Sequence, residues 1–283
     1  MENTPGLSIR HLCPRCMGET LDKSLYCAAC AVVYKQYQSE EGLSIIDFLN
    51  SKDTVFDYSQ LKSSGEKPVF HYKSKILIPF LKMKGLKVLD AGAREGPLGW
   101  LLAKDNYLVG LDICPSQSLG DGDNMLNKGY RELLIADANR IPIAGGELDL
   151  VIATDILEHN LQPEQLLKEF RRVLKKGGKV ITTVPNMVSY NNRLSIVLGS
   201  GVGLELHKIL QGKSPVHPIA GMRYPDQDLH VRFFSLKSLE KMFLQEGFTI
   251  RKTFGYDPVL SRIPCMDLLL KNWCNLCGLI AEK

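Results

Sequence analysis

Cysteines are crowded at the amino-terminal end of this 283-residue chain, where four of its eight lie within the first thirty positions. They follow the spacing Cys13-x2-Cys16-x10-Cys27-x2-Cys30. Each closely spaced pair can form a tight knuckle that presents two thiolates to one tetrahedral zinc ion. Two such pairs in tandem favour a metal site over a redox pair or four unrelated buried thiols. Because four thiolates leave no open coordination position, we expect the zinc to be structural rather than catalytic.

A second set of chemically competent residues begins where an apolar run ends in VLDAGAREG. Gly92 and Gly96 permit a tight turn and a close approach of a ligand to the backbone, and Asp90 places a carboxylate at the end of the run. About twenty residues later the next apolar run ends at Asp112, whose carboxylate can accept hydrogen bonds from both hydroxyls of a ribose. A glycine loop followed by an acid at this distance indicates an adenosine-containing ligand.

The glycine loop distinguishes between two adenosine ligands. A dinucleotide needs Gly-x-Gly-x-x-Gly around its pyrophosphate, whereas the segment here is Gly92-Ala93-Arg94-Glu95-Gly96-Pro97. This segment resembles motif I of the class I S-adenosylmethionine-dependent methyltransferases, Asp-x-Gly-x-Gly-x-Gly, with Asp90, Gly92 and Gly96 in register and Arg94 in place of the middle glycine. The resemblance implies S-adenosyl-L-methionine as the cofactor, with the loop beneath its methionine part and Asp112 at its ribose.

The resemblance continues along the chain. The stretch IADANRIPIAGGELDLVIATDILEHN is similar to the family segment in which an acid, here Asp137, approaches the adenine amino group. LLKEFRRVLKKGGKVITTVPN is similar to the helix, Gly-Gly turn and fifth strand that follow, and DLHVRFFSLKSLEKMFLQEGF resembles the late segment of ubiquinone-type and homoserine-associated methyltransferases. The implied cofactor-binding residues are Asp90, Gly92, Ala93, Arg94, Gly96, Asp112, Ile113, Asp137, Ala138 and Asp155.

The amino-terminal pattern, CPRC followed by YCAACAVVYKQYQSEEGLSIIDFL, resembles the zinc ribbon of a tRNA-methyltransferase activator subunit, a ribbon also fused to many methyltransferases. Similar ribbons precede the 23S ribosomal RNA guanine-N1 methyltransferases, but those typically have a histidine where Cys30 stands. Within the ribbon we expect short strands at 31–34 and 43–46 around a polar turn at 36–42.

The elements that must position these residues follow from the hydrophobic pattern. Short apolar runs predict strands at 87–91, 107–112, 132–136, 148–154, 179–184, 249–254 and 276–281. Helical patterns separate them, most clearly at 164–175, where the apolar residues Leu166, Leu167, Phe170, Val173 and Leu174 share one face. This alternation indicates βαβ crossovers and a mostly parallel sheet that binds ligands at the carboxyl ends of its strands. The family resemblance implies a Rossmann-like, doubly wound α/β sheet of seven strands, with the last strand antiparallel.

The predicted domains are a zinc ribbon at 1–50, a linker and lead-in helix at 51–75, and a class I methyltransferase domain at 76–283. Within the last, the segment at about 186–234 is too long for a simple connection. Long insertions in compact domains are usually lids or binding loops, so we assign substrate selection to it.

Methyl transfer from a sulfonium needs the acceptor atom about 3 Å from the methyl carbon, and an oxygen or carbon acceptor needs help in losing a proton. His230 is the first choice for a base that faces the substrate, although it can instead hydrogen-bond the lid. His159 is the second choice, with packing and capping of the following helix as its alternative role. Asp155 completes the predicted catalytic set and can instead orient the cofactor or an amine.

Charge bears on the class of partner. The chain has 35 basic and 31 acidic side chains, of which four and six fall within the first fifty residues. The small excess of basic over acidic side chains is well short of the dense basic stripe of many nucleic-acid binders. An acidic ribbon beside a basic domain also favours docking between the two. The basic run Lys168, Arg171, Arg172, Lys175, Lys176 and Lys179 fits the solvated side of one helix. We therefore predict a small-molecule or carrier-linked acceptor, disfavouring nucleic acid without excluding it.

Two other functions stay open: an RNA methyltransferase that grips RNA through the ribbon, and a catalytically silent binding module. The sequence also predicts no membrane span and a reducing, cytoplasmic environment, because it shows no signal-peptide pattern and no long apolar run. Cys274 and Cys277 are expected to be buried thiols rather than a second metal site. The pattern leaves the acceptor and the oligomeric state open.

Overall fold

The computed structural model describes residues 8–18, 21, 24–30, 32–38, 44–49, 82–93, 102, 105–113, 129–199, 230–257, 260 and 266–283. The predicted linker and lead-in helix at 51–75, the loop residues Arg94 and Gly96, and the 200–229 part of the predicted lid lie outside the described residues.

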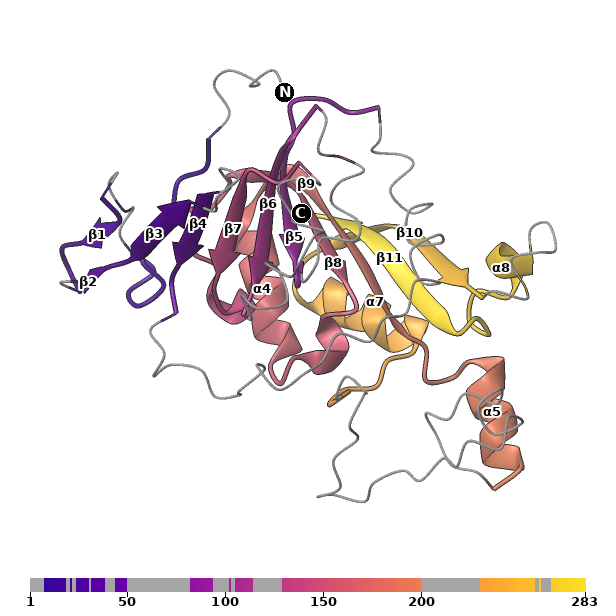
Figure 1. Ribbon diagram of the computed structural model, residues 1–283. Coiled ribbons are helices and arrows are strands. Elements are labelled where there is room, and N and C mark those ends of the chain that lie inside the picture. Colours follow the sequence, from indigo (N-terminus) through magenta and orange to yellow (C-terminus); the bar gives the residue numbers. More distant parts are fainter. Residues whose placement is uncertain are drawn as a thin grey trace.

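One nine-stranded sheet organises the described chain, in the order β10-β11-β9-β8-β5-β6-β7-β4-β3 (Figure 1). The first seven strands of this order are the seven that the hydrophobic pattern predicts: β5 (Lys87–Ala91), β6 (Tyr107–Asp112), β7 (Glu132–Ile135), β8 (Leu148–Thr154), β9 (Leu174–Pro185), β10 (Thr249–Tyr256) and β11 (Leu276–Glu282). Strands β5 to β9 pair in parallel, and β11 is antiparallel to both of its neighbours. The Rossmann-like α/β fold and the antiparallel last strand are therefore confirmed.

Strand β9 begins earlier than its apolar pattern indicates. Helix α4 (Pro163–Val173) ends two residues before the predicted end, and Leu174 already pairs with Leu148 of β8. The amide of Glu147 donates to the carbonyl of Val173 over 2.9 Å. Residues 175–178, which include the expected Gly-Gly turn, lie within the bounds of β9, but the ladder with β8 passes from Leu174 to Lys179 and shifts its register there.

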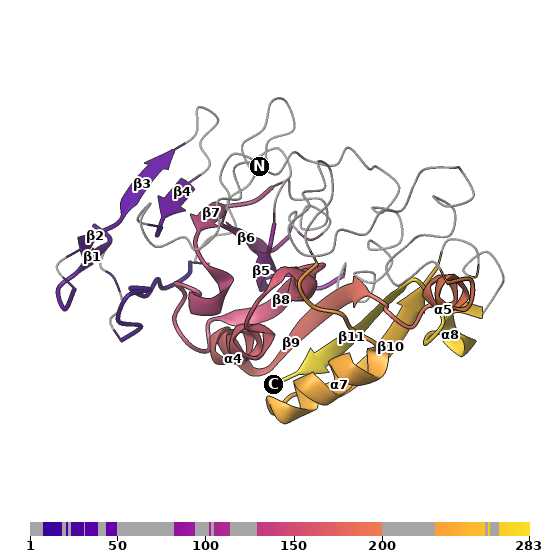
Figure 2. The same cartoon turned by 90° about the horizontal axis from the view of Figure 1, so that it is seen from below.

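Helices cover one face of the sheet in the described chain. Figure 2 shows α4 and α7 (Leu236–Gln245) on the same side of the strands. The five apolar residues predicted to share a helix face are all fully buried there, and they pack in one cluster with strand residues such as Leu89 and Val151. The alternate strand residues, such as Val88 and Ile152, form a second cluster on the other face. No helix among the described residues is both long and apolar enough to cross a membrane.

The amino-terminal segment joins the same sheet. Strand β4 (Ser44–Asp47) pairs in parallel with β7, and β3 (Lys35–Gln38) pairs antiparallel with β4 at the sheet edge. A two-stranded ladder of β1 (Tyr26–Cys27) and β2 (Val32–Val33) lies beside them. The prediction of a turn from residue 36 was therefore wrong for 36–38. An edge strand can expose its side chains, as Gln36 does while donating to the Ser44 hydroxyl over 3.0 Å, so it needs no apolar alternation.

Backbone and ionic contacts attach the cysteine-rich segment to the domain. His11 forms an antiparallel bridge with Ile143, and its ring lies 3.1 Å from the Glu132 carboxylate. Arg10 forms an ion pair with Glu147. Docking between the amino-terminal segment and the domain is thus confirmed. The charges in contact are the reverse of the net charges, because basic side chains of the amino-terminal segment meet acidic side chains of the domain.

Replacing Phe48 tests whether the amino-terminal segment shares the core. Phe48 is 4% exposed and its ring centroid lies 5.0 Å from that of Tyr34. We expect Phe48→Ala to lower the free energy of unfolding by about 3–5 kcal/mol, measured by urea denaturation, because a buried aromatic ring is lost.

Val33→Ala is the matched control, since Val33 is 65% exposed in the same segment. It should change stability by less than about 0.5 kcal/mol. Two separate transitions, with only the smaller one affected by Phe48→Ala, would contradict a shared core.

Candidate functional site

The four amino-terminal cysteines converge. Their sulfur atoms all lie within 4.8 Å of one another, and the Sγ atoms of Cys16 and Cys27 are 3.8 Å apart. The first knuckle is closed by the amide of Met17, which donates to the carbonyl of Cys13 over 2.8 Å. Cys13 and Cys27 are fully buried, whereas Cys16 is exposed. The set has the donor number and softness that zinc prefers.

The acidities of these thiols differ. Burial opposes ionisation of Cys13, but the Tyr34 hydroxyl at 3.1 Å and the backbone amides of Cys16 and Arg15 outweigh it and lower the pKa of the Cys13 thiol to about 6. Burial raises the pKa of Cys27 to about 12. Four adjacent thiolates therefore require a cation to replace the protons that the protein alone would retain.

The end of β5 and the turn after it form the first part of the expected cofactor site. Gly92 adopts φ +73°, and the amides of Gly92 and Ala93 both donate to the carbonyl of Leu111, over 2.8 and 3.1 Å. Asp90 is only 3% exposed, and its carboxylate accepts a hydrogen bond from the Tyr130 hydroxyl. Asp90 thus braces the start of the loop from within the protein, and Tyr130 is a supporting residue that sequence reasoning missed.

The next acids lie at the ends of β6 and β7, which are neighbouring strands. Asp112 pairs with Ile135 in the parallel ladder, and its carbonyl accepts from the amide of Ala136 over 3.0 Å. Asp137 precedes the 3₁₀ turn Ala138–Arg140 (η4), and one of its carboxylate oxygens accepts from the amide of Asn139 over 2.8 Å. The predicted residues Asp112, Ile113, Asp137 and Ala138 therefore lie at the ends of two adjacent strands, at the same edge of the sheet.

Asp155 follows β8 in an unusual conformation. Its φ of +53° is in the left-handed region, which costs about 1–2 kcal/mol for a residue with a side chain. Its amide donates to the carbonyl of Thr183 over 2.9 Å, and the Thr183 hydroxyl donates to its carboxylate over 2.8 Å. These contacts with β9 hold the Asp155 side chain in place, and Thr183 gives no sign of this role in the sequence.

The two candidate histidines come together after the end of β8. The rings of His159 and His230 have centroids 4.9 Å apart, although 71 positions separate the residues in the sequence. Glu158 lies next to them with an exposed fraction of 1%, and its carboxylate is 4.0 Å from the His159 ring nitrogen. Glu158 is a further functional candidate; adjacency to His159 was its only sequence signal.

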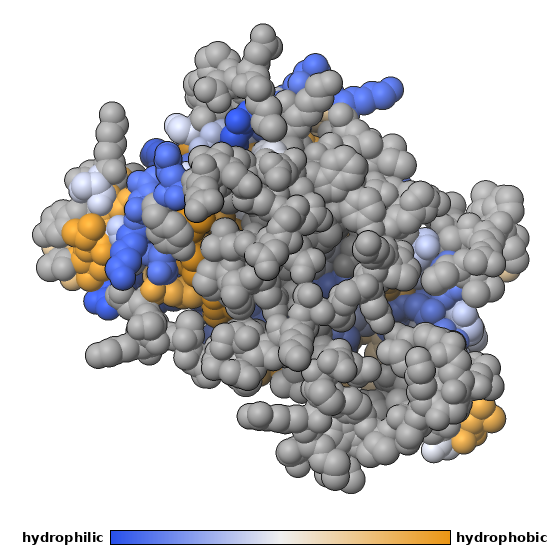
Figure 3. All heavy atoms as spheres, viewed as in Figure 1, coloured by the Kyte–Doolittle hydropathy of each residue, from blue (hydrophilic) through white to orange (hydrophobic). Residues whose placement is uncertain are grey.

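Helix α5 (Tyr190–Val197) is the described part of the predicted lid. Arg193 stacks over the Trp273 ring at 4.3 Å from its centroid, which ties the helix to the segment before β11. Ile196, Val197 and Leu198 are 53%, 81% and 62% exposed. An apolar area is visible at this end of the molecule in the space-filling view (Figure 3).

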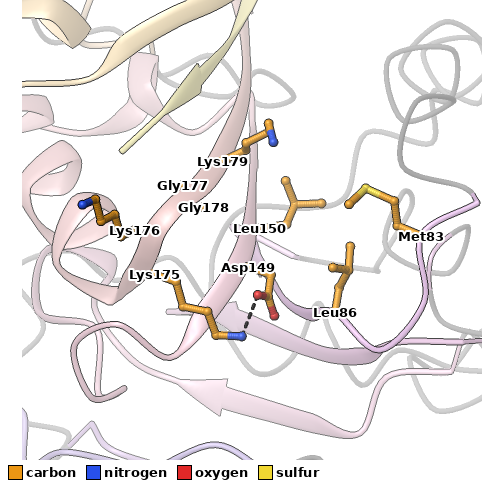
Figure 4. Close-up of a pocket in the computed structure, with 9 residues that line it drawn as sticks. All are labelled: Met83, Leu86, Asp149, Leu150, Lys175, Lys176, Gly177, Gly178 and Lys179. Carbon is orange, nitrogen blue, oxygen red and sulfur yellow. Dashed lines mark hydrogen bonds and ion pairs between the residues drawn. The ribbon is translucent and has the colours of Figure 1, made fainter.

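A cavity of about 150 Å³ lies elsewhere, at the amino end of β8 (Figure 4). Lys175 forms an ion pair with Asp149 over 2.6 Å in its wall. None of its nine lining residues belongs to the predicted site, and ligands of parallel sheets bind at the opposite strand ends, so this cavity is not the candidate site.

Cys274 and Cys277 are confirmed as buried thiols, with exposed fractions of 0% and 1%. Burial, with the nearby charge of Glu158, raises the pKa of Cys277 to about 12. Neither belongs to a cluster of metal-ligating side chains among the described residues.

Comparisons with known proteins agree with this geometry. Residues 89–182 match the family model described as a methyltransferase domain. The chain is 24% identical over 263 residues to an uncharacterized protein of Methanocaldococcus jannaschii, covering 90% of this chain and 97% of that one. It is 36% identical over 102 residues to the ubiquinone/menaquinone biosynthesis C-methyltransferase UbiE of Cupriavidus necator, covering 34% of this chain and 42% of that enzyme. It is 28% identical over 163 residues to the ubiquinone biosynthesis O-methyltransferase of Coxiella burnetii, covering 52% and 65%.

Solved structures share the fold. The [4+2]-cyclase SpnF is 18% identical with a TM-score of 0.52, covering 78% of this chain and 84% of that one. A putative methyltransferase of Bacillus halodurans is 14% identical with a TM-score of 0.51, covering 75% and 99%. The family match and the fold show an S-adenosylmethionine-dependent methyltransferase domain of a general kind. The chain spans less than two thirds of the length of the two quinone-pathway relatives.

Substitutions at two glycines with the same left-handed φ distinguish the effect of backbone strain from an effect on the expected cofactor loop. Gly92 and Gly85 have φ of +73° and +72°. A Cβ would lie 3.2 Å from the Ile156 side chain at Gly92, whereas at Gly85 it would meet nothing within 4 Å among the described residues. We expect Gly92→Ala and Gly85→Ala each to cost about 1–2 kcal/mol of stability from the strained φ.

Only Gly92→Ala should also weaken S-adenosylmethionine binding, measured by calorimetry, because its methyl group pushes against Ile156 at the loop. Equal affinities in the two variants would argue against a cofactor loop at Gly92.

Proposed function

We propose that this protein methylates a small or medium-sized metabolite, free or carrier-linked, of the natural-product, glycan or lipid-like kind. The observation that carries the proposal is the convergence of the loop at Gly92, the acid Asp112 and the His159–His230 pair at the carboxyl ends of neighbouring parallel strands. A methyl donor bound at the Gly92 loop and Asp112 would face an acceptor bound at the two histidines, at one edge of the sheet.

On the donor side, the turn at Gly92 and Ala93 would lie beneath the methionine part of the cofactor and Asp112 would accept hydrogen bonds from its ribose. Ile113, Asp137 and Ala138 would surround the adenine. Arg94 and Gly96, which lie outside the described residues, complete the proposed set. Bound S-adenosyl-L-methionine supplies a methyl group on a positively charged sulfur, and these residues orient it.

On the acceptor side, Asp155, His159 and His230 would position the acceptor atom in line with the methyl–sulfur bond and promote loss of its proton. In the simplest form His230 takes that proton, since it comes from the segment that closes on the end of β8. The amides of Val231 and Arg232 donate to the carbonyl of Glu158 over 2.8 and 3.0 Å, which supports this closure.

Several contacts favour a metabolite over RNA as the acceptor. Arg172 of the basic run pairs with Glu169 at 2.8 Å and donates to the carbonyls of Ile141 and Ile143, so its charge serves internal contacts. Lys175 likewise pairs with Asp149. The exposed apolar end of α5 suits a partly hydrophobic acceptor. RNA binding at low salt would instead support the RNA methyltransferase alternative. A failure to bind S-adenosylmethionine would support the silent binding module.

We further propose that Cys13, Cys16, Cys27 and Cys30 hold one structural Zn²⁺. The convergence of four sulfurs supports this, as does the contact of Cys13 with Tyr34, which packs on Phe48 of the shared core. Zinc would thereby order the segment that carries β3 and β4 into the sheet. Thiolates of this kind need a reducing compartment, which fits the expected cytoplasmic location.

Replacing Asp112 tests the donor side. Asp112→Asn preserves the shape of the side chain but replaces the charged carboxylate that would accept hydrogen bonds from the ribose hydroxyls. We expect S-adenosylmethionine binding to weaken by about 10- to 150-fold, because a hydrogen bond to a charged group contributes about 1.5–3 kcal/mol. Calorimetry measures the affinity, and labelled methyl transfer into extracts measures the activity.

Asp105→Asn is the control, since Asp105 precedes the same strand and pairs with Lys84 at the surface over 3.4 Å. Unchanged cofactor affinity in Asp112→Asn would overturn the assignment of the ribose to this acid.

Metal analysis tests the zinc proposal. In protein purified under reducing conditions the four cysteines should hold about one zinc per chain, and Cys27→Ser should lose that zinc and unfold at a lower temperature. Cys274→Ser, at an equally buried thiol outside the cluster, should keep the zinc. Zinc content that is the same in both variants would disprove the site.

A further inference from the structure

A second cluster of metal-ligating side chains lies on the acceptor side of the candidate site. Glu158, His159 and His230 each offer one ligand atom, and these atoms all lie within 4.8 Å of one another. Among the described residues, only this cluster and the four cysteines have such an arrangement. Its donors are one carboxylate and two imidazoles, whereas the first cluster has only sulfur.

The fold builds this cluster from two distant segments. Glu158 and His159 lie in the 3₁₀ turn Leu157–His159 (η5) directly after β8, and His230 comes from the segment that leads into α7. The amides of Val231 and Arg232 both donate to the carbonyl of Glu158. The Arg232 guanidinium donates to the carbonyl of Leu161 over 2.7 Å. Backbone contacts thus hold His230 against the turn without using any of the three ligand atoms.

Burial differs among the three side chains in a way that suits a metal. The side chain of Glu158 is 2% exposed, that of His159 is 25% exposed, and His230 is exposed. A divalent cation is a strong partner for a carboxylate in a buried position, because it is the largest local charge in such a site. The exposed side of the cluster leaves room for water or substrate oxygen in the remaining coordination positions.

We propose that Glu158, His159 and His230 bind one divalent first-row transition-metal cation. Two imidazoles and one carboxylate suit zinc, iron(II), manganese(II) or cobalt(II), and unlike four thiolates they leave coordination positions open. The present distances, such as 4.0 Å between the Glu158 and His159 donor atoms, need only a small contraction to bring all three within about 2.0–2.2 Å of one ion.

The place of the cluster suggests what the cation does, and this step rests on the proposed function. Among the side chains that the structure describes, Ile156, two residues before Glu158, lies closest to the Cβ position of Gly92 in the donor loop. A cation in the cluster would hold a hydroxyl of the acceptor and lower its pKa, so that the proton passes to water. The oxygen then forms a bond to the methyl carbon as the carbon–sulfur bond breaks, giving a methyl ether and S-adenosylhomocysteine. The acceptor class is therefore an alcohol or phenol. With the cation bound, the two histidines are its ligands, and water replaces His230 as the group that takes the proton.

Cobalt(II) titration of the full chain, with its cysteine site already filled with zinc, tests the proposal without any acceptor. We expect about one Co²⁺ per chain with visible d–d bands and no added thiolate-to-cobalt absorption, since nitrogen and oxygen are the ligands. His230→Ala should weaken Co²⁺ binding by about 100-fold or more and keep its fold, because His230 is exposed. Glu158→Gln provides a second variant that keeps the side-chain volume.

His11→Gln is the matched control, because His11 also lies beside a carboxylate, at 3.1 Å from Glu132, but has no third ligand nearby among the described residues. It should bind Co²⁺ as the unaltered protein does. Absence of Co²⁺ uptake by the zinc-filled protein, or equal uptake by His230→Ala, would overturn the metal site. Calorimetry with S-adenosylmethionine, run on the same samples, reports separately on the proposed methyltransferase function.

Discussion

The parallel pairing of β5 with β6 and β8 is the constraint on which the candidate site depends. Val88 is in register with both Leu108 and Leu150, so the three strands run together and end at the same edge of the sheet. The loop at Gly92 and the acids Asp112 and Asp155 follow directly from those ends. Because backbone groups within a ladder pair with the neighbouring strands, the polar groups at and beyond the strand ends are the ones available to a ligand.

The same pairing principle explains how the cysteine-rich segment is incorporated. Strand β4 extends the parallel run beside β7, and its two central residues, Ile45 and Ile46, contribute to the clusters on opposite faces of the sheet. A strand buried on both faces is held by the core rather than by the thiol cluster alone. The sulfur cluster, through Cys13 and Tyr34, then adds a local constraint at the outer end of that core.

The site divides into two halves with different physical character. On the donor side, the loop is braced by a buried carboxylate, Asp90, and by the carbonyl of Leu111, which leaves little freedom to the backbone around Gly92. On the proposed acceptor side, Asp155 has a left-handed backbone that is maintained by two hydrogen bonds with Thr183. Local strain held by its surroundings is common at functional sites, and here it falls where an acceptor would bind.

The local sequence pattern was sufficient to predict the central strands, and the spacing of the cysteines was sufficient to predict their cluster. The boundaries of β5, β6 and β8 follow from apolar runs, and the buried face of α4 follows from its periodicity. Both can be predicted because the spacing of apolar residues within a single segment indicates which side chains are buried. Three features depended on residues far apart in the chain: the pairing of β4 with β7, the hydrogen bond from Tyr130 to Asp90, and the meeting of Glu158 and His159 with His230. The sequence by itself determined which residues form the central strands of the sheet and which carry reactive groups. Only the tertiary structure decided which of those groups meet, because contacts between distant segments are set by sheet pairing and core packing and leave no periodic trace in either segment.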